Sequence, residues 1–137
     1  MTRVSLSPSN LSPTITTRRL QETRDFYERH FGAEAVFDCG WYVQLKLSGG
    51  VEICLMAPQE DAPAYQGGVT LNLRVDDVDA AHTVLRRADV PVVIPLEDHP
   101  WGDRGFGIAD PSGVVVYCFK PIAPSAEFAP FFKEAQT

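Results

Sequence analysis

The strongest constraint on this chain is that its sequence repeats itself. When the 137 residues are shifted by 58 positions, the segment that begins at Ser12 aligns with the segment that begins at Thr70. Each segment opens with a β-prone stretch, continues with a helical pattern and ends with three short strand-like runs that turn residues separate. The same order of elements in both copies predicts an α+β fold of two βαβββ modules, whose eight strands can curl around a shared hollow.

The spacing of apolar residues places the elements of each copy. In the first copy, Leu20, Phe26 or Tyr27, and Phe31 recur on one helical face, and Gly32 is expected to end the helix. The expected helix of the second copy covers residues 78–88, and the expected strands cover residues 14–17, 33–39, 41–47, 51–56, 69–75, 90–94, 105–109 and 114–119.

Length and composition fit one folded domain. The hydrophobic fraction of 45% and the charged fraction of 22% are typical of a globular protein with a packed core. We expect a single domain over residues 1–137, in which Phe128, Phe131 and Phe132 pack on the body, on a dimer mate or across the cavity mouth. The expected divisions are a first module at 11–57, a linker at 58–68, a second module at 69–121 and a tail at 122–137.

Charge and cysteine usage argue against several classes of protein. A net charge of -6 and a pI near 4.9 do not provide the basic stripe that nucleic-acid binding requires. The three cysteines form no C-x-x-C pair, so buried free thiols are expected instead of a disulfide framework or a zinc knuckle. The first ten residues lack the apolar stretch of a secretory signal, and no apolar run reaches membrane-spanning length. We therefore expect a cytoplasmic protein.

Three segments resemble the signatures of one superfamily. They are residues 25–32 (DFYERHFG), residues 75–79 (VDDVD) and residues 101–113 (WGDRGFGIADPSG). Together they resemble the vicinal oxygen chelate superfamily of glyoxalases, bleomycin-resistance proteins and dioxygenases, over roughly residues 12–121. The closest type is the metal-free, drug-binding, bleomycin-resistance-like protein. The resemblance implies a homodimer in which a module of one chain pairs with a module of the other.

Enzymes of this superfamily typically hold a divalent ion with His and Glu side chains near the start of each module's first strand and on its last strand. The repeat and the Phe-Tyr motif place the corresponding positions at Ser12, Cys54, Thr70 and Tyr117. None of these four side chains is the expected imidazole or carboxylate. We therefore expect no metal, no other cofactor and no catalytic residue of the usual kind.

Three other polar residues, Glu52, His99 and Arg104, are candidates for the wall or the mouth of the hollow. Glu52 lies two residues before Cys54, so both point to one strand face, where Glu52 is either a polar wall residue or a rim carboxylate. His99 is expected in a loop near the mouth, and Arg104 is open to a ligand-facing or a structural role. His30 and His82 are expected at helix surfaces.

A hollow without an ion must recognise its ligand by shape, stacking and a few hydrogen bonds. Flat aromatic side chains favour a planar aromatic ligand, and the acidic net charge favours a cationic one. The expected ligand-binding residues are Trp41, Tyr42, Glu52, Cys54, His99, Trp101, Arg104, Phe106 and Tyr117.

These observations leave three hypotheses for the function. The first is a metal-independent protein that sequesters an aromatic, natural-product antibiotic. The second is a glyoxalase-like lyase, an isomerase or a dioxygenase, whose ion would be held by substitutes such as Glu52, His99 or Tyr117. The third is an interaction or regulatory module with a vestigial cavity.

Overall fold

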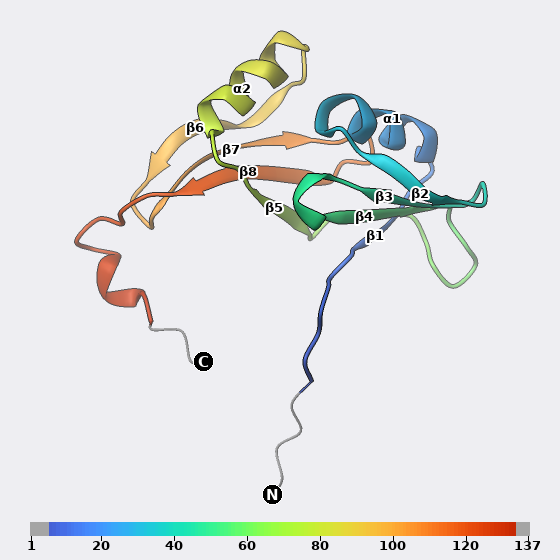
Figure 1. The fold of residues 1–137 in the computed structure, drawn as a ribbon, viewed down its shortest axis with the longest axis horizontal. Coiled ribbons are helices and arrows are strands. Elements are labelled where there is room, and N and C mark those ends of the chain that lie inside the picture. The colour runs from blue at the N-terminus through green and yellow to red at the C-terminus, as the bar shows by residue number, and fades with distance from the viewer. Residues whose placement is uncertain (1–5, 134–137) are drawn as a thin grey trace, which may run out of the picture. The chain divides into compact units, whose positions relative to one another are not determined.

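The chain folds into two compact units, one that ends at Gln66 and one that begins at Gly67 (Figure 1). The computed structural model describes residues 6–133 of the 137. Each unit contains one four-stranded sheet and one α-helix, which packs on one face of that sheet (Figure 1). We call the face that the helix does not cover the open face of the unit. No helix of the described residues is both long enough and apolar enough to span a membrane.

The first unit is a βαβββ module. Its sheet has the order β1-β4-β3-β2, in which β1 runs parallel to β4 and the other neighbours are antiparallel. The elements are β1 (Thr14–Thr16), α1 (Leu20–Phe31), β2 (Glu34–Asp38), β3 (Tyr42–Lys46), the 3-10 turn η1 (Ser48–Gly50) and β4 (Glu52–Met56).

Local sequence explains where α1 begins and ends. The Thr17 hydroxyl accepts a hydrogen bond from the backbone N–H of Arg19, which satisfies an amide that the first turn would otherwise leave unpaired. At the other end, Gly32 adopts a left-handed conformation with φ of 64°, and its N–H bonds the Tyr27 carbonyl. The expected end of this helix at Gly32 is thus confirmed. Its buried side is formed by Thr23 and Tyr27, not by the apolar residues of the predicted face alone.

The second unit repeats the topology of the first. Its sheet has the order β5-β8-β7-β6, again with one parallel pair, β5 and β8, and two antiparallel pairs. The predicted α+β fold of two βαβββ modules is therefore confirmed. The elements are β5 (Thr70–Arg74), α2 (Val78–Arg87), β6 (Val92–His99), β7 (Asp103–Ala109), β8 (Val115–Pro121) and the 3-10 turn η2 (Ala129–Phe131).

Caps and turns of the second unit follow its sequence. The Asp77 carboxylate accepts a hydrogen bond from the N–H of Ala80 and so caps α2. Between β7 and β8, the Asp110 carboxylate accepts from the N–H groups of Ser112 and Val114, and Gly113 has φ of 87°. The turn thus has the chemistry that its sequence predicts.

The core of each unit lies between its helix and its sheet. Alternate strand residues point toward the helix and are buried, because neighbouring side chains of a strand point to opposite faces. In the first unit these residues are Val43, Leu45, Ile53 and Leu55, and in the second they are Phe106, Ile108, Val116 and Cys118.

Strand β6 is longer than predicted, and this moves a candidate site residue. We expected a strand over 90–94, followed by a loop that contains His99, but β6 continues through Pro95 and ends at His99. Pro95 is tolerated because β6 is an edge strand, where no neighbour needs its missing N–H. Register irregularities on both sides of Ile94 allow the strand to continue.

The segment after β8 lies partly against the second unit. Phe128 is half-buried, with its ring centroid 6.4 Å from that of Trp101. Phe131 and Phe132 remain 69% and 62% exposed. The structure therefore gives two of the three tail phenylalanines large exposed surfaces.

Candidate functional site

The open face of the second unit carries a compact group of aromatic and polar side chains. We call His99, Trp101, Asp103 and Tyr117 the Tyr117 cluster. His99 ends β6, Trp101 lies in the following turn, Asp103 begins β7 and Tyr117 is on β8. Tyr117 alternates along β8 with Val116 and Cys118, which are buried beneath α2, so its ring lies on the other side of the sheet.

Hydrogen bonds converge on Asp103 at the centre of the cluster. Its Oδ1 accepts from the Tyr117 hydroxyl at 2.8 Å and lies 2.7 Å from His99 Nδ1, while its Oδ2 accepts from the Trp101 indole N–H at 3.1 Å. Tyr117 Oη and His99 Nδ1 are 3.1 Å apart. A carboxylate that holds three donors from three separate positions fixes their side chains in place.

The environment keeps the Tyr117 phenol neutral. Desolvation by burial raises the pKa of Tyr117 well above its usual value, and the hydrogen bond to Asp103 and the negative charge of that carboxylate raise it further. Tyr117 is therefore a protonated hydrogen-bond donor over the whole physiological range. Its proton is held by the Asp103 carboxylate.

The rings of the cluster form one stacked pair among themselves and a second with the neighbouring Phe119. The His99 and Trp101 rings lie 4.5 Å apart with an interplanar angle of 4°, and the Tyr117 and Phe119 rings lie 6.0 Å apart with an angle of 18°. Trp101 is still 48% exposed. The cluster therefore offers flat aromatic surface to solvent at a position that hydrogen bonds hold rigid.

Gly105 makes room for the Tyr117 ring. A Cβ atom at Gly105 would lie 2.6 Å from both Cζ and Oη of Tyr117, and 2.8 Å from the carbonyl oxygen of Cys118. The absence of a side chain thus lets the phenol cross the neighbouring strand and reach Asp103. Asn72 and Arg74, which pair in register with Tyr117 and Phe119, add exposed polar groups next to the cluster.

The open face of the first unit carries a smaller polar group around Tyr42. Its hydroxyl lies 3.4 Å from Thr14 Oγ1. A hydrogen bond with the buried Cys54 side chain raises the pKa of Tyr42, and the hydrogen bond with Thr14 opposes this effect. On the same strand as Cys54, Glu52 accepts a hydrogen bond of 2.9 Å from the Asn10 amide. The group is neutral apart from Glu52.

Trp41 extends this group toward solvent. Its ring centroid lies 6.1 Å from that of Tyr42, Phe37 approaches Tyr42 from another side at 6.3 Å, and Trp41 is 53% exposed. In the first unit, Tyr42 thus contacts both Trp41 and Cys54, whereas Glu52 lies at the opposite end of the β3–β4 pair from Trp41. Three other predicted binding residues, His99, Trp101 and Tyr117, lie together in the second unit.

The structure does not bring Arg104 and Phe106 into either group. Both point toward α2, because they alternate along β7 with Asp103 and Gly105. The Arg104 guanidinium binds both carboxylate oxygens of Asp79 on α2, at 2.8 and 3.2 Å, and Asp98 at 2.9 Å. Phe106 is fully buried, and its ring lies 5.0 Å from that of His82. Both contacts join α2 to its sheet.

Sequence reasoning missed Asp103, which holds the cluster together. We placed the strand start at Gly105, so Asp103 and Arg104 were both assigned to the preceding loop. The signal that could have found Asp103 is the period of two, since it lies two residues before Gly105 and therefore on the same face. The same period assigns Arg104 and Phe106 to the opposite face.

The donor set of the superfamily's metal enzymes is not present at the corresponding positions. Within residues 6–133, no group of three or more His, Cys, Asp or Glu side chains is arranged to hold a metal ion. Ser12 and Thr70 are exposed hydroxyl residues, Cys54 is buried against Tyr42, and the Tyr117 phenol is neutral. These residues do not fit a catalytic divalent ion.

Comparison with known proteins agrees with the fold described above. Residues 11–117 match the family described as Glyoxalase/Bleomycin resistance protein/Dioxygenase superfamily. The structure of TnmS3, an antibiotic-binding protein from Streptomyces sp. CB03234, is similar with a TM-score of 0.70 and 25% identity, over 85% of this chain and 99% of that one. A superfamily member from Sphaerobacter thermophilus is similar with a TM-score of 0.69 and 28% identity, over 80% and 94% of the two chains.

A curated relative matches only part of the chain. An uncharacterized protein of Mycobacterium bovis is 47% identical over 53 residues, which are 37% of this chain and 35% of that protein. The match thus spans about a third of the length of this relative.

Proposed function

The chain belongs to the Glyoxalase/Bleomycin resistance protein/Dioxygenase superfamily, and on this premise we propose that it binds a small aromatic ligand and holds it unchanged. The proposed ligand class is the aromatic, cationic natural-product antibiotic, and the proposed role is sequestration. We further propose that the protein works as a cytoplasmic homodimer.

The observation that carries this proposal is the state of Tyr117. It stands at the last-strand position where metal-dependent members are expected to have a carboxylate, and its neutral phenol is already bound to Asp103. What this face offers a ligand is therefore flat ring surface, not an ion. The likeness to an antibiotic-binding protein of the same superfamily supports the same reading.

The two unit faces suit the proposed ligand in different ways. Offset or edge contacts with a planar ligand contribute about 0.5–1.5 kcal/mol each beyond area burial, and Trp101 and Tyr117 present such surfaces in the second unit. In the first unit, the Glu52 carboxylate suits a positively charged substituent, and the exposed ring of Trp41 adds aromatic surface at the opposite end of the β3–β4 pair.

A fluorescence titration tests the proposal. Bleomycin, doxorubicin and mitomycin C are the probes, and quenching of Trp41 and Trp101 emission reports binding. Trp101→Ala should weaken binding by roughly tenfold, about 1.4 kcal/mol, because one stacking surface is lost. The matched control is Val84→Ala, which changes an exposed apolar residue of α2. Absence of quenching by every probe, in an assay that detects a known drug-binding protein, contradicts the proposal.

One observation favours a second candidate, an enzyme of the same superfamily. His99 Nδ1 is held by the Asp103 carboxylate, the arrangement that orients an imidazole for proton transfer. Its other nitrogen, Nε2, lies 4.0 Å from Glu97. Mass spectrometry of each probe after incubation separates the two functions, since unchanged probe supports sequestration and altered probe supports the enzyme. Metal analysis of protein purified without chelators distinguishes a metal-dependent enzyme from both.

A further inference from the structure

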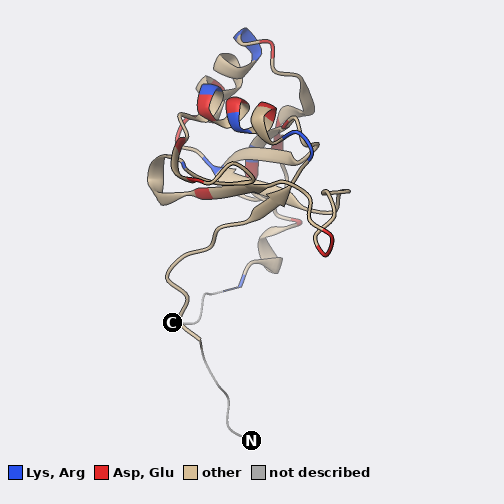
Figure 2. Ribbon diagram, turned by 90° about the vertical axis from the view of Figure 1, so that its right-hand side faces the viewer, with Lys and Arg blue, Asp and Glu red and all other residues tan. Residues whose placement is uncertain are grey.

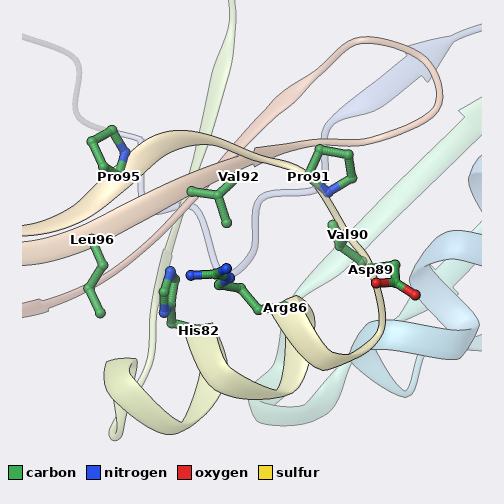
Figure 3. Close-up of a pocket in the computed structure, with 8 residues that line it drawn as sticks. All are labelled: His82, Arg86, Asp89, Val90, Pro91, Val92, Pro95 and Leu96. Atoms are coloured by element: carbon green, nitrogen blue, oxygen red, sulfur yellow. The ribbon is translucent and has the colours of Figure 1, made fainter.

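A separate groove lies between α2 and β6 in the second unit (Figure 3). Its volume is about 720 Å³, within the range of small-molecule sites, and no residue of the Tyr117 cluster lines it. The groove exists because α2 packs mainly against β7 and β8, while β6 at the sheet edge departs from regular register near Ile94. The helix and the edge strand therefore diverge.

The floor of the groove is apolar. Val90 follows α2, and Val92 and Leu96 on β6 point into the space between strand and helix (Figure 3). Pro91 and Pro95 line the same strand side and carry no N–H that would need a partner there. An apolar chain could lie along this strip and bury surface on both sides.

The helix side of the groove carries the positive charge of Arg86. His82 and Arg86 are one turn apart on α2, and Figure 3 shows the Arg86 guanidinium beside the His82 ring and directed over the groove. The last turn of α2 contains two basic residues, Arg86 and Arg87. Basic residues at a helix C-terminus interact favourably with the helix dipole. That interaction explains why Arg86 is at this end of α2, but it does not explain why its side chain extends over the groove.

Arg86, like Arg29 and Arg74 among the described residues, has no carboxylate partner. Arg24 and Arg104 each bind two carboxylates, whereas the Arg86 guanidinium makes no hydrogen bond or ion pair with any described residue. Asp89 lines the same groove, but Figure 3 shows its carboxylate at the far end and turned away from Arg86. In a chain with a net charge of -6, an unpaired guanidinium over an apolar strip points to an anionic ligand.

We propose that this groove binds a small amphipathic carboxylate. The Arg86 fork receives the carboxylate, since its paired N–H groups match the two oxygens, and the apolar tail lies along Val90, Val92 and Leu96. This site is independent of the aromatic-ligand site proposed above, because the two lie on opposite faces of the second sheet.

The test compares three probes of one chain length, octanoate, 1-octanol and octylammonium, by methyl-resolved NMR titration. Octanoate should shift the methyl resonances of Val90, Val92 and Leu96 and bind at least fivefold more tightly than 1-octanol, with octylammonium weakest. Equal binding of octanoate and 1-octanol would overturn the role of Arg86. Shifts confined to residues around Tyr117 would overturn the location.

Two variants separate recognition from helix stability. Arg86→Gln should weaken octanoate binding at least tenfold and leave 1-octanol binding unchanged. The control is Arg29→Gln, which removes a basic residue from the last turn of α1 and should leave octanoate binding unchanged. An Arg86→Gln protein that folds and binds octanoate like the parent refutes the proposal, whatever the outcome of the antibiotic titration.

Discussion

At the residue scale, a single glycine permits the arrangement around Tyr117. Gly105 should not tolerate alanine, because the added methyl group would meet the Tyr117 ring and the Cys118 carbonyl below normal contact distance. We expect Gly105→Ala to lower the free energy of unfolding by about 1–3 kcal/mol, measured by urea denaturation. The same change in a Tyr117→Ala background should still destabilise, because the backbone contact with Cys118 remains. A parent-like midpoint for the single variant would contradict the close contacts described at both Tyr117 and the Cys118 carbonyl.

Thiol burial gives a second prediction at this scale. Cys39 is exposed, whereas Cys54 and Cys118 are buried. Ellman's reagent should therefore modify Cys39 quickly in the native protein and reach the other two only in denaturant. Rapid modification of Cys54 or Cys118 without denaturant would contradict the described packing.

Cys118 also predicts a pH dependence of stability. Burial raises the pKa of its thiol from 9.0 to about 11, so the folded state keeps the proton that the unfolded chain loses first. The free energy of unfolding is therefore unaffected by this thiol below about pH 9, and it falls as the pH rises from about 9 toward about 11. Urea denaturation across this window should show a smaller decline for Cys118→Ala than for the parent chain. Equal declines would mean that other groups cause the loss.

The sequence predicts some site residues correctly and others wrongly, and the difference lies in which face of its strand each residue occupies. Cys54 and Tyr117 were placed by the repeat, which preserves the period of two, and both lie on an open face. Arg104 and Phe106 were selected by residue type within a family-like motif, and neither residue type nor motif determines the face of the strand. Asp103 was missed because a carboxylate that binds three side-chain donors has no local sequence signature.

At the scale of elements, a side-chain cap begins α2, whereas the N-cap residue of α1 makes no side-chain cap hydrogen bond. Asp77 accepts from the N–H of Ala80, so Asp77→Ala should lower the free energy of unfolding by about 1 kcal/mol. Asp76→Ala is the matched control, because it removes an adjacent exposed carboxylate without touching the cap. Thermal or urea denaturation measures both. Equal losses in the two variants would mean that charge, not the cap, stabilises this end of α2.

Element order was predictable because the repeat provides it twice. The two sheets, with their matching strand orders and single parallel pairs, follow from that order. The end of β6 was not predictable in the same way, since Pro95 normally argues against a strand and only the edge position of β6 removes the objection. His99 therefore belongs to a strand end and not to a loop.

At the scale of the whole molecule, charge and apolar exposure have different distributions. Acidic and basic residues both occur along the helices (Figure 2). Helix α1 carries ion pairs such as that of Arg24 with Glu28. Exposed aromatic side chains instead lie outside the two α-helices, at Phe37, Trp41, Trp101, Phe131 and Phe132. No local sequence pattern could predict this exposure, because it depends on what each ring meets after folding.

The exposed tail phenylalanines lead to the last prediction, which concerns the proposed homodimer. Two adjacent rings that are 69% and 62% exposed are costly to leave in water, and a second chain is the partner that the superfamily resemblance implies. Sedimentation should therefore find a dimer, and the double variant Phe131→Ser and Phe132→Ser should raise its dissociation constant at least tenfold. Val84→Ser, at an exposed position of α2, should leave the dimer intact. A parent chain that sediments as a monomer refutes the dimer, and a double variant that dimerises like the parent assigns the contact to another surface.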